Sequence, residues 1–190
     1  MTKAEARKQY LQKRNSLTEG EFAQLSRNLS DVFFSSLDLS FVNVLHTFLP
    51  IHKNNEPDTW MIIDRARREY PHIRIAVPKI NPDNASLDNF YFEGWHQLEK
   101  NTWGIPEPKQ GVPVPAEKID MILVPLLAVD KKGNRVGYGR GFYDKFLATV
   151  NPNTQKIGLS FFAPVDSLTD MLATDIKLTG VITPKEALQF

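Results

Sequence analysis

The sequence has no cysteine, no imbalance of charge and no long apolar run, and each absence excludes a class of protein. Without cysteine there are no disulfides, no thiolate catalysis and no zinc sites with cysteine ligands. With 23 basic against 22 acidic side chains, the net charge of +1 does not draw the chain to nucleic acid or to an anionic membrane. No apolar run approaches the roughly 20 residues of a membrane span, and residues 1–7 contain no signal-peptide core.

We therefore expect a monomeric, cytoplasmic protein whose partner is a small molecule, with no nucleic-acid and no membrane partner. A length of 190 residues fits one domain, spanning residues 1–190. The content of 42% hydrophobic and 11% aromatic residues supplies a core and excludes disorder as a class. Because the net charge is close to zero, any anion-binding function must be local.

Segments typical of helices and of strands alternate along the chain. Helices are predicted over residues 3–14, 19–36 and 59–70, and the second opens with a capping-box pair, Thr18 and Glu21. Strands are predicted over residues 41–48, 73–78, 119–129, 155–161 and 178–183, of which the last is the final strand we expect. The alternation predicts an α/β protein, a three-layer α/β/α sandwich with a mostly parallel, Rossmann-like sheet.

Glycines are concentrated directly after the apolar run 119–129. Four fall within nine residues, where average usage gives about one or fewer, and they are Gly133, Gly137, Gly139 and Gly141. A helical pattern then begins at Phe142. The order strand, glycine loop, helix predicts an anion site, because the first N–H groups of a helix have no internal partner and the helix dipole adds positive charge there.

Polar side chains in this stretch suit a phosphate ligand. Arg135 and Arg140 add two positive charges, and a guanidinium binds a phosphate through two hydrogen bonds. Tyr143 offers a hydroxyl, and Asp144 offers a carboxylate for an Mg²⁺ shared with a polyphosphate. The alternative is a simple turn whose arginines are solvated. The stretch is not a P-loop, since it has no Gly-Lys-Ser/Thr, and it lacks the Gly-x-Gly-x-x-Gly of dinucleotide folds.

Residues 133–144, Gly-Asn-Arg-Val-Gly-Tyr-Gly-Arg-Gly-Phe-Tyr-Asp, resemble the signature of the 5-formyltetrahydrofolate cyclo-ligases, also called 5,10-methenyltetrahydrofolate synthetases. Similar motifs follow the family order along nearly the whole chain. The resemblance implies an enzyme that uses ATP and Mg²⁺ to close 5-formyltetrahydrofolate into 5,10-methenyltetrahydrofolate. It implies a phosphorylated formyl group as the intermediate, with ADP and phosphate as the other products.

The resemblance also implies site residues outside the glycine stretch. A Lys-x-x-x-Arg whose cations reach the ATP phosphates matches Lys3 and Arg7, although on the residues alone these are two solvated charges on one helix face. A Glu-x-x-Thr that contacts the folate matches Glu56 in the loop after the first strand. Trp103, within the family-like segment 101–108, is assigned to stacking on the folate ring, with core packing as the alternative.

The metal end of the pattern departs from the family. Asp175 lies where the family has a carboxylate associated with Mg²⁺, but the second aspartate usual four residues later is Thr179 in this sequence. The residues assigned to metal binding are Asp144, from the glycine stretch, and Asp175, from the resemblance. The predicted ATP contacts of the glycine stretch are Arg135, Gly137, Tyr138, Gly139, Arg140, Gly141, Phe142 and Tyr143. Among these, Arg135, Arg140 and Tyr143 are assigned to catalysis, and Tyr138 also to the folate.

Two other functions are compatible with the residues. A sugar-phosphate isomerase-like α/β enzyme would hold a single phosphate in the glycine loop and use Glu56 as its proton-shuttling base. A non-catalytic nucleotide-binding module would bind ATP without turnover.

Overall fold

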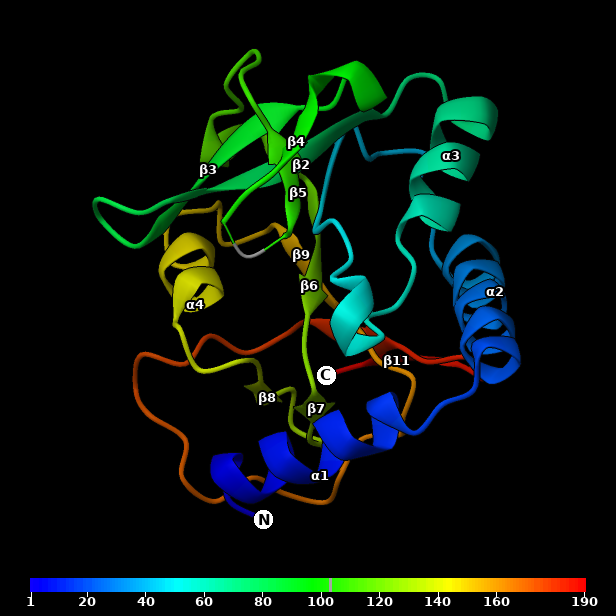
Figure 1. Ribbon diagram of the computed structural model, residues 1–190, viewed down its shortest axis with the longest axis vertical. Coiled ribbons are helices and arrows are strands. Elements are labelled where there is room, and N and C mark those ends of the chain that lie inside the picture. The colour runs from blue at the N-terminus through cyan, green and yellow to red at the C-terminus, as the bar shows by residue number, and fades with distance from the viewer. Residues whose placement is uncertain (103) are drawn as a thin grey trace.

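The computed structural model describes residues 1–102 and 104–190, and within them the chain forms a seven-stranded sheet in the order β11-β10-β9-β6-β1-β2-β3 (Figure 1). The five inner strands run parallel, whereas the edge strands β3 and β11 are antiparallel to their neighbours. The strands are β1 (Val44–Thr47), β2 (Arg74–Asn81), β3 (Ser86–Tyr91), β6 (Met121–Pro125), β9 (Gln155–Leu159), β10 (Gly180–Ile182) and β11 (Ala187–Gln189).

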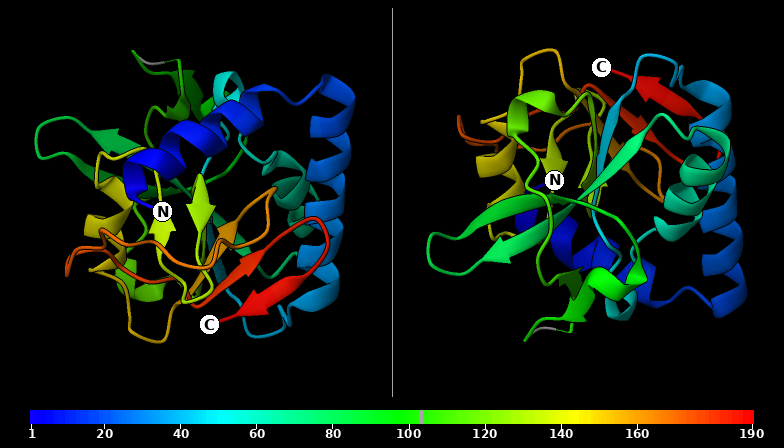
Figure 2. Two further views of the ribbon diagram at one scale, coloured as in Figure 1. Left: turned by 90° about the horizontal axis from the view of Figure 1, so that it is seen from below. Right: turned by 90° about the horizontal axis from the view of Figure 1, so that it is seen from above.

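Helices cover both faces of this sheet. Helices α2 (Glu19–Ser36) and α3 (Trp60–Glu69) lie on one face, and α4 (Phe142–Leu147) lies on the other (Figure 1). Helix α1 (Lys3–Asn15) crosses the end of the sheet, where it packs on two short strands (Figures 1 and 2). The predicted three-layer α/β class with a mostly parallel sheet is confirmed.

The inner strands are apolar on both sides, as the unbroken apolar run predicts for a strand buried between two layers. In β6, Met121 and Leu123 belong to the core shared with α2 and α3, while Ile122 and Val124 belong to the core shared with α4. All four side chains are 0% exposed. A Leu123→Ala change would therefore cost about 2–5 kcal/mol of stability, the range for a large-to-small change in a closed core.

Local sequence signals set the starts of the first two helices. Capping boxes close the amino ends of α1, through Thr2 and Glu5, and of α2, through Thr18 and Glu21. Each box satisfies backbone N–H groups that otherwise have no partner in the helix. The predicted helices 3–14 and 19–36 are confirmed within a residue. Because Thr2 is the N-cap of α1, Lys3 is the first residue of that helix.

The strands predicted at 41–48 and 73–78 and the helix predicted at 59–70 form a βαβ unit, since β1, α3 and β2 follow one another and β1 pairs with β2 in parallel. Strand β2 then continues into an antiparallel hairpin with β3 that is longer than the sequence indicated, with six residue pairs from Ala76 to Asn81. The smaller elements are η1 (His52–Asn54), η2 (Trp95–Gln97), η3 (Ala116–Lys118), β4 (Leu98–Lys100) and β5 (Pro106–Pro108). No helix in the described part of the chain is long and apolar enough to cross a membrane.

The predicted single strand 119–129 is wrong in its second half. Strand β6 ends at Pro125, and β7 (Ala128–Val129) pairs instead with β8 (Arg135–Val136) in a separate two-stranded ribbon. The buried carboxylate of Asp130 holds the intervening turn, accepting hydrogen bonds from the backbone N–H of Lys132, Asn134 and Leu168. The path is therefore strand, ribbon, loop, helix, and Arg135 lies on a strand of the ribbon.

Two further corrections concern short elements. Helix α4 has only six residues, so few peptide dipoles add at its amino end, and the helix-terminus argument for anion binding weakens accordingly. Residues 178–183 do not form the last strand, because β11 follows β10 and pairs with it antiparallel. Strand β11 has three residues, a length at which periodicity carries little signal.

Candidate active site

A cavity of about 410 Å³ lies beyond the carboxyl ends of β1 and β6. Its wall includes Phe48, just after β1, and Pro125, the last residue of β6. The rest of the wall comes from α1, the loop after β1, the β2–β3 hairpin, residues 105–107, residues 135–144 and Asp175. Open α/β sheets bind their ligands at this edge of the sheet.

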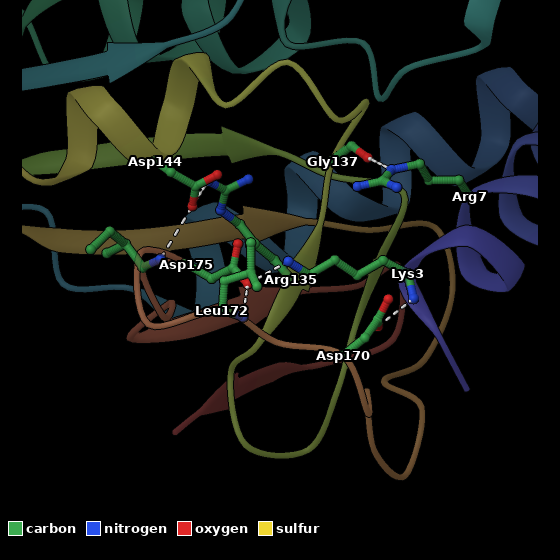
Figure 3. Close-up of polar contacts among 9 residues, drawn as sticks. Lys3, Arg7, Arg135, Gly137, Asp144, Asp170, Leu172 and Asp175 are labelled. Atoms are coloured by element: carbon green, nitrogen blue, oxygen red, sulfur yellow. Dashed lines mark hydrogen bonds and ion pairs between the residues drawn. The ribbon is translucent and has the colours of Figure 1, made fainter.

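Five cationic side chains line this cavity: Lys53, from η1, and a group of four, Lys3, Arg7, Arg135 and Arg140. Lys3 and Arg7 come from α1 and are drawn with Arg135 in Figure 3. Arg135 and Arg140 flank Gly137 and Gly139 in the sequence. Arg7 is held in place because its Nε donates a 3.0 Å hydrogen bond to the carbonyl oxygen of Gly137. We call this group of four cations the cationic wall.

Lys3 contacts two residues near the carboxyl end of the sequence, Asp170 and Asp175. Its side chain pairs with Asp175, and its backbone N–H donates to Asp170 Oδ1 at 2.7 Å (Figure 3). Asp175 also accepts a 2.6 Å hydrogen bond from the N–H of Leu172. Burial alone would raise the pKa of Asp175, but the hydrogen bonds from Lys3 and Leu172 lower it, so the carboxylate stays ionised beside the lysine.

Arg135 is more deeply buried than the other cations, with 7% of its surface exposed. Its Nη2 donates to Asp144 Oδ1 at 2.7 Å, and the same oxygen accepts from the N–H of Ile176 at 3.1 Å (Figure 3). Burial lowers the pKa of Arg135 while Asp144 opposes that effect, and an arginine keeps its charge under such conditions. Its Nε has no hydrogen-bond partner among the described residues, so a ligand oxygen would find a buried donor there.

Gly139 lets the loop approach Arg7 closely. Its φ is +88°, in the region that favours glycine, and an added Cβ would lie 3.3 Å from Cζ of Arg7. A side chain at this position would strain the backbone and push the guanidinium away. Both the backbone conformation and the close contact with Arg7 therefore require glycine at position 139.

The lining also contains a buried carboxylate, Glu56, with 2% of its surface exposed, and we call the part of the lining around Glu56 the carboxylate end of the cavity. Its Oε2 accepts a 2.7 Å hydrogen bond from the N–H of Ile51. Burial raises the pKa of Glu56, while the Ile51 amide, the Tyr138 hydroxyl and the Arg14 guanidinium oppose the rise. The loop that carries Glu56 is anchored by Thr59, whose hydroxyl donates to the carbonyl oxygen of Phe48 at 2.7 Å.

Two tyrosines from the glycine stretch complete this end. Tyr138 accepts a hydrogen bond from Arg14 Nη2, whereas the buried hydroxyl of Tyr143 has no partner among the described residues. Burial raises the pKa of both tyrosines, so both hydroxyls keep their protons at neutral pH. Apolar side chains line the remaining wall, and they are Phe48, Leu49, Ile51, Pro78, Ile80, Leu87, Ile105, Pro106, Pro125 and Val136.

The predicted site residues converge on this one cavity. Its lining includes Lys3, Arg7, Glu56, Arg135, Gly137, Tyr138, Gly139, Arg140, Gly141, Phe142, Tyr143, Asp144 and Asp175. Trp103 lies outside the described residues. Arg140 lines the cavity but is exposed, in contrast to the buried Arg135.

Sequence reasoning missed three polar residues of the lining, Lys53, Asn54 and Glu107. Glu107 is 8% exposed and accepts hydrogen bonds from the N–H of Ile80 and from Asn101 Nδ2. Its place inside the family-like segment 101–108 was a usable signal. Lys53 and Asn54 carried no such signal, because polar residues in a loop are usually solvated.

The fold and this cavity define a class of protein: an α/β protein with a ligand-sized cavity that combines a cationic wall, apolar side chains and a buried carboxylate. A family model described as the 5-formyltetrahydrofolate cyclo-ligase family matches residues 1–184. The chain belongs to this family of ATP-dependent ligases of folate metabolism, as the resemblance predicted.

Individual relatives cover nearly the whole chain. The 5-formyltetrahydrofolate cyclo-ligase of Escherichia coli (strain K12) is 26% identical over 185 residues, spanning 94% of this chain and 98% of that protein. The enzyme of the same name from Mycoplasma pneumoniae is 26% identical over 200 residues, spanning 96% and 98%. The solved structure of Aquifex aeolicus 5,10-methenyltetrahydrofolate synthetase superposes with a TM-score of 0.85 at 27% identity, covering 100% of this chain and 93% of that one.

Proposed function

We propose that this protein closes 5-formyltetrahydrofolate into 5,10-methenyltetrahydrofolate at the expense of ATP, releasing ADP and phosphate. The observation that carries the proposal is the convergence, in one cavity, of a cationic wall and a buried carboxylate separated by apolar side chains. A polyphosphate suits the first, and a flat heteroaromatic ring with N–H donors suits the second. A monomeric state remains a prediction from the sequence.

The reaction needs activation because an amide-like formyl oxygen is a poor leaving group. The formyl oxygen attacks the γ-phosphorus of ATP, ADP departs, and the formyl carbon becomes electrophilic. N10 of the folate then attacks that carbon and loses its proton. The C–O bond breaks, and the oxygen leaves as part of inorganic phosphate.

Phosphoryl transfer asks the protein for positioning and for neutralisation of charge more than for covalent chemistry. The cationic wall supplies the charge. Lys3 and Arg135 are already aligned by Asp175 and Asp144, so their side chains need little reordering when phosphate oxygens arrive. Tyr143 presents a protonated hydroxyl that has no partner among the described residues and can donate to an oxygen of the transferring group.

The donor set fits an Mg²⁺ that arrives with ATP. Asp144 and Asp175 both line the cavity, and Mg²⁺ is commonly held by one or two carboxylates together with substrate phosphates and waters. The described residues contain no group of three or more His, Asp or Glu side chains that would hold a metal by themselves. When bound near Asp144 and Asp175, Mg²⁺ would neutralise negative charge on the phosphate groups.

Glu56 and Tyr138 are assigned to the folate. A carboxylate is the natural acceptor for the amino and ring N–H groups of a pterin. The apolar wall removes water from the ring and from the reacting formyl group. Trp103 remains a proposed folate contact from the family resemblance alone.

The direct test mixes the purified protein with ATP, Mg²⁺ and 5-formyltetrahydrofolate and follows the ultraviolet absorbance of the methenyl product. Formation of product that requires ATP is the expected result. A sugar-phosphate isomerase would ignore ATP, and a non-catalytic nucleotide-binding module would bind it without turnover.

An isotope experiment tests the order of bond making. With ¹⁸O in the formyl group and ordinary water, the heavy oxygen should enter phosphate on each turnover. If ATP were hydrolysed only to drive a conformational change, the phosphate would take its oxygen from water. Unlabelled phosphate, under conditions where the formyl oxygen does not exchange with solvent, would overturn the phosphorylated-formyl step.

A further inference from the structure

Arg14, near the carboxyl end of α1, is 3% exposed although arginines are almost never buried without a partner. It stands behind the carboxylate end of the cavity and is not part of the lining itself. Its Nη2 donates to the hydroxyl oxygen of Tyr138, and its Nη1 donates to the carbonyl oxygen of Leu126 at 3.4 Å. The cost of burying this charge calls for a functional reason.

The direction of the hydrogen bond limits what Tyr138 can do. A guanidinium only donates, so the Tyr138 oxygen must accept from Arg14. The hydroxyl proton is then left to point elsewhere, and the Glu56 carboxylate interacts with this same hydroxyl. Arg14 and Tyr138 are therefore joined by a hydrogen bond, and both lower the pKa of Glu56; we call these three residues the relay.

Charge balance points the same way. A buried carboxylate is costly unless a nearby cation compensates it. Arg14 interacts electrostatically with Glu56 from behind Tyr138, without occupying the space that a ligand would need. The backbone supports this placement, because Asn55 Nδ2, next to Glu56, donates to the Arg14 carbonyl oxygen at 2.9 Å.

We propose that Arg14 is a positioning residue of the folate pocket, which orients the Tyr138 hydroxyl and supplies the counter-charge that keeps Glu56 an acceptor for the ligand. This assignment rests on the proposed function, since it takes the occupant of the pocket to be a folate. It adds to α1 a second role: Lys3 and Arg7 face the polyphosphate, and Arg14 prepares the carboxylate end.

The test compares Arg14→Met, which keeps an unbranched apolar stem and removes the charge and the donors, with Lys13→Met on the same helix. Lys13 is exposed and outside the cavity lining, so its change is a matched loss of one positive charge. Arg14→Met should raise the KM for 5-formyltetrahydrofolate about tenfold, the scale of a lost charged hydrogen bond, and leave the KM for ATP within about twofold. Lys13→Met should leave both within about twofold.

Two more variants separate positioning from packing. Arg14→Lys should restore part of the folate affinity, because it returns the charge. Tyr138→Phe removes the hydroxyl that links Arg14 to Glu56, so the double variant Arg14→Met/Tyr138→Phe should have a folate KM no higher than the worse single variant.

The outcomes distinguish this assignment from the proposed function. An inactive wild-type protein would overturn both. An active wild type in which Arg14→Met leaves the folate KM unchanged, or raises both KM values equally, would overturn only the role of Arg14. If Arg14→Met does not fold, Tyr138→Phe decides, because a folate KM within about twofold of wild type would show that the relay contributes nothing.

Discussion

The two ends of the cavity solve the problem of charge in different ways. At the cationic wall, Lys3 and Arg135 each face a carboxylate of their own chain, and the side chains of Asp175 and Asp144 are 17% and 26% exposed. At the carboxylate end, Glu56 is 2% exposed and faces a tyrosine and an amide, with Arg14 behind them. One end holds ion pairs whose carboxylates are partly exposed, and the other holds a buried carboxylate without an ion-pair partner among the described residues.

The difference teaches what each end is prepared for. An ion pair at a cavity wall can exchange its carboxylate for a phosphate without leaving a charge unpaired, so the cationic wall suits a ligand that arrives and departs in every cycle. Glu56 instead suffers desolvation before any ligand is bound, which destabilises the free protein. Such a cost is common where a site is preorganised for a ligand.

The largest effect should come from the cationic wall. Arg135→Met removes a buried cation and leaves Asp144 without its ion-pair partner, so kcat/KM for ATP should fall about 10-fold to 150-fold, given about 1.5–3 kcal/mol for a charged hydrogen bond. Steady-state kinetics at varied ATP measures the loss.

The matched control is Arg65→Met, which breaks ion pairs with Asp31 and Glu69 outside the cavity lining. Exposed pairs of this kind contribute about 0–1 kcal/mol, so activity should change by less than about twofold. Unchanged ATP kinetics in Arg135→Met would mean that the cationic wall does not bind the polyphosphate.

Glu56→Gln tests the other end of the comparison. The change keeps the shape and removes the charge, so the KM for 5-formyltetrahydrofolate should rise about tenfold while ATP binding is spared. Kinetics with each substrate varied in turn measures the separation. Loss of ATP binding in this variant would show that the two ends of the cavity are not distinct.

Asp144→Asn tests whether Asp144 binds the Mg²⁺ that accompanies ATP. The Mg²⁺ concentration for half-maximal activity should rise on the order of fivefold, since Asp175 still offers a carboxylate, and folding should be intact. A magnesium titration gives the value, and circular dichroism checks the fold. A normal titration would place the metal away from Asp144 and leave that residue as the partner of Arg135.

The smallest expected effect is on how the stability of the folded state depends on pH. Burial raises the pKa of Glu56, so the folded state keeps its proton after the unfolded state has lost it. Wild-type stability should therefore fall, relative to Glu56→Gln, as pH rises from about 4.5 through the raised folded pKa. Melting temperatures of both proteins at several pH values measure this difference.

Exposed Glu69 provides a control of opposite sign. The hydrogen bond from Arg65 lowers the pKa of Glu69, so its contribution is present above the ordinary glutamate pKa and is lost as pH falls. Relative to Glu69→Gln, wild type should gain stability with rising pH. The same trend in both variants would remove the contrast between a buried and a solvated carboxylate.

Much of the fold follows from local sequence. The capping box at Thr18 and Glu21 and the apolar periodicity after it predict α2, and the unbroken apolar run predicts β6. The β7–β8 ribbon and β11 do not follow, because strands of two or three residues exist only through their pairing partners. Consequently Arg135, which the sequence placed in a loop, lies on strand β8 in the structure.

For the site, the sequence by itself determined the chemical groups: the glycines, the arginines of the stretch 133–144 and the family signature that assigned Glu56 and Asp175. Only the tertiary structure decided which of them meet. Lys3 and Asp175 are 172 residues apart in the chain and form an ion pair, and Arg14, an ordinary helix cation by sequence, becomes the buried partner of Tyr138. The physical reason is that charge pairing and burial depend on distance in space, which local propensity does not encode.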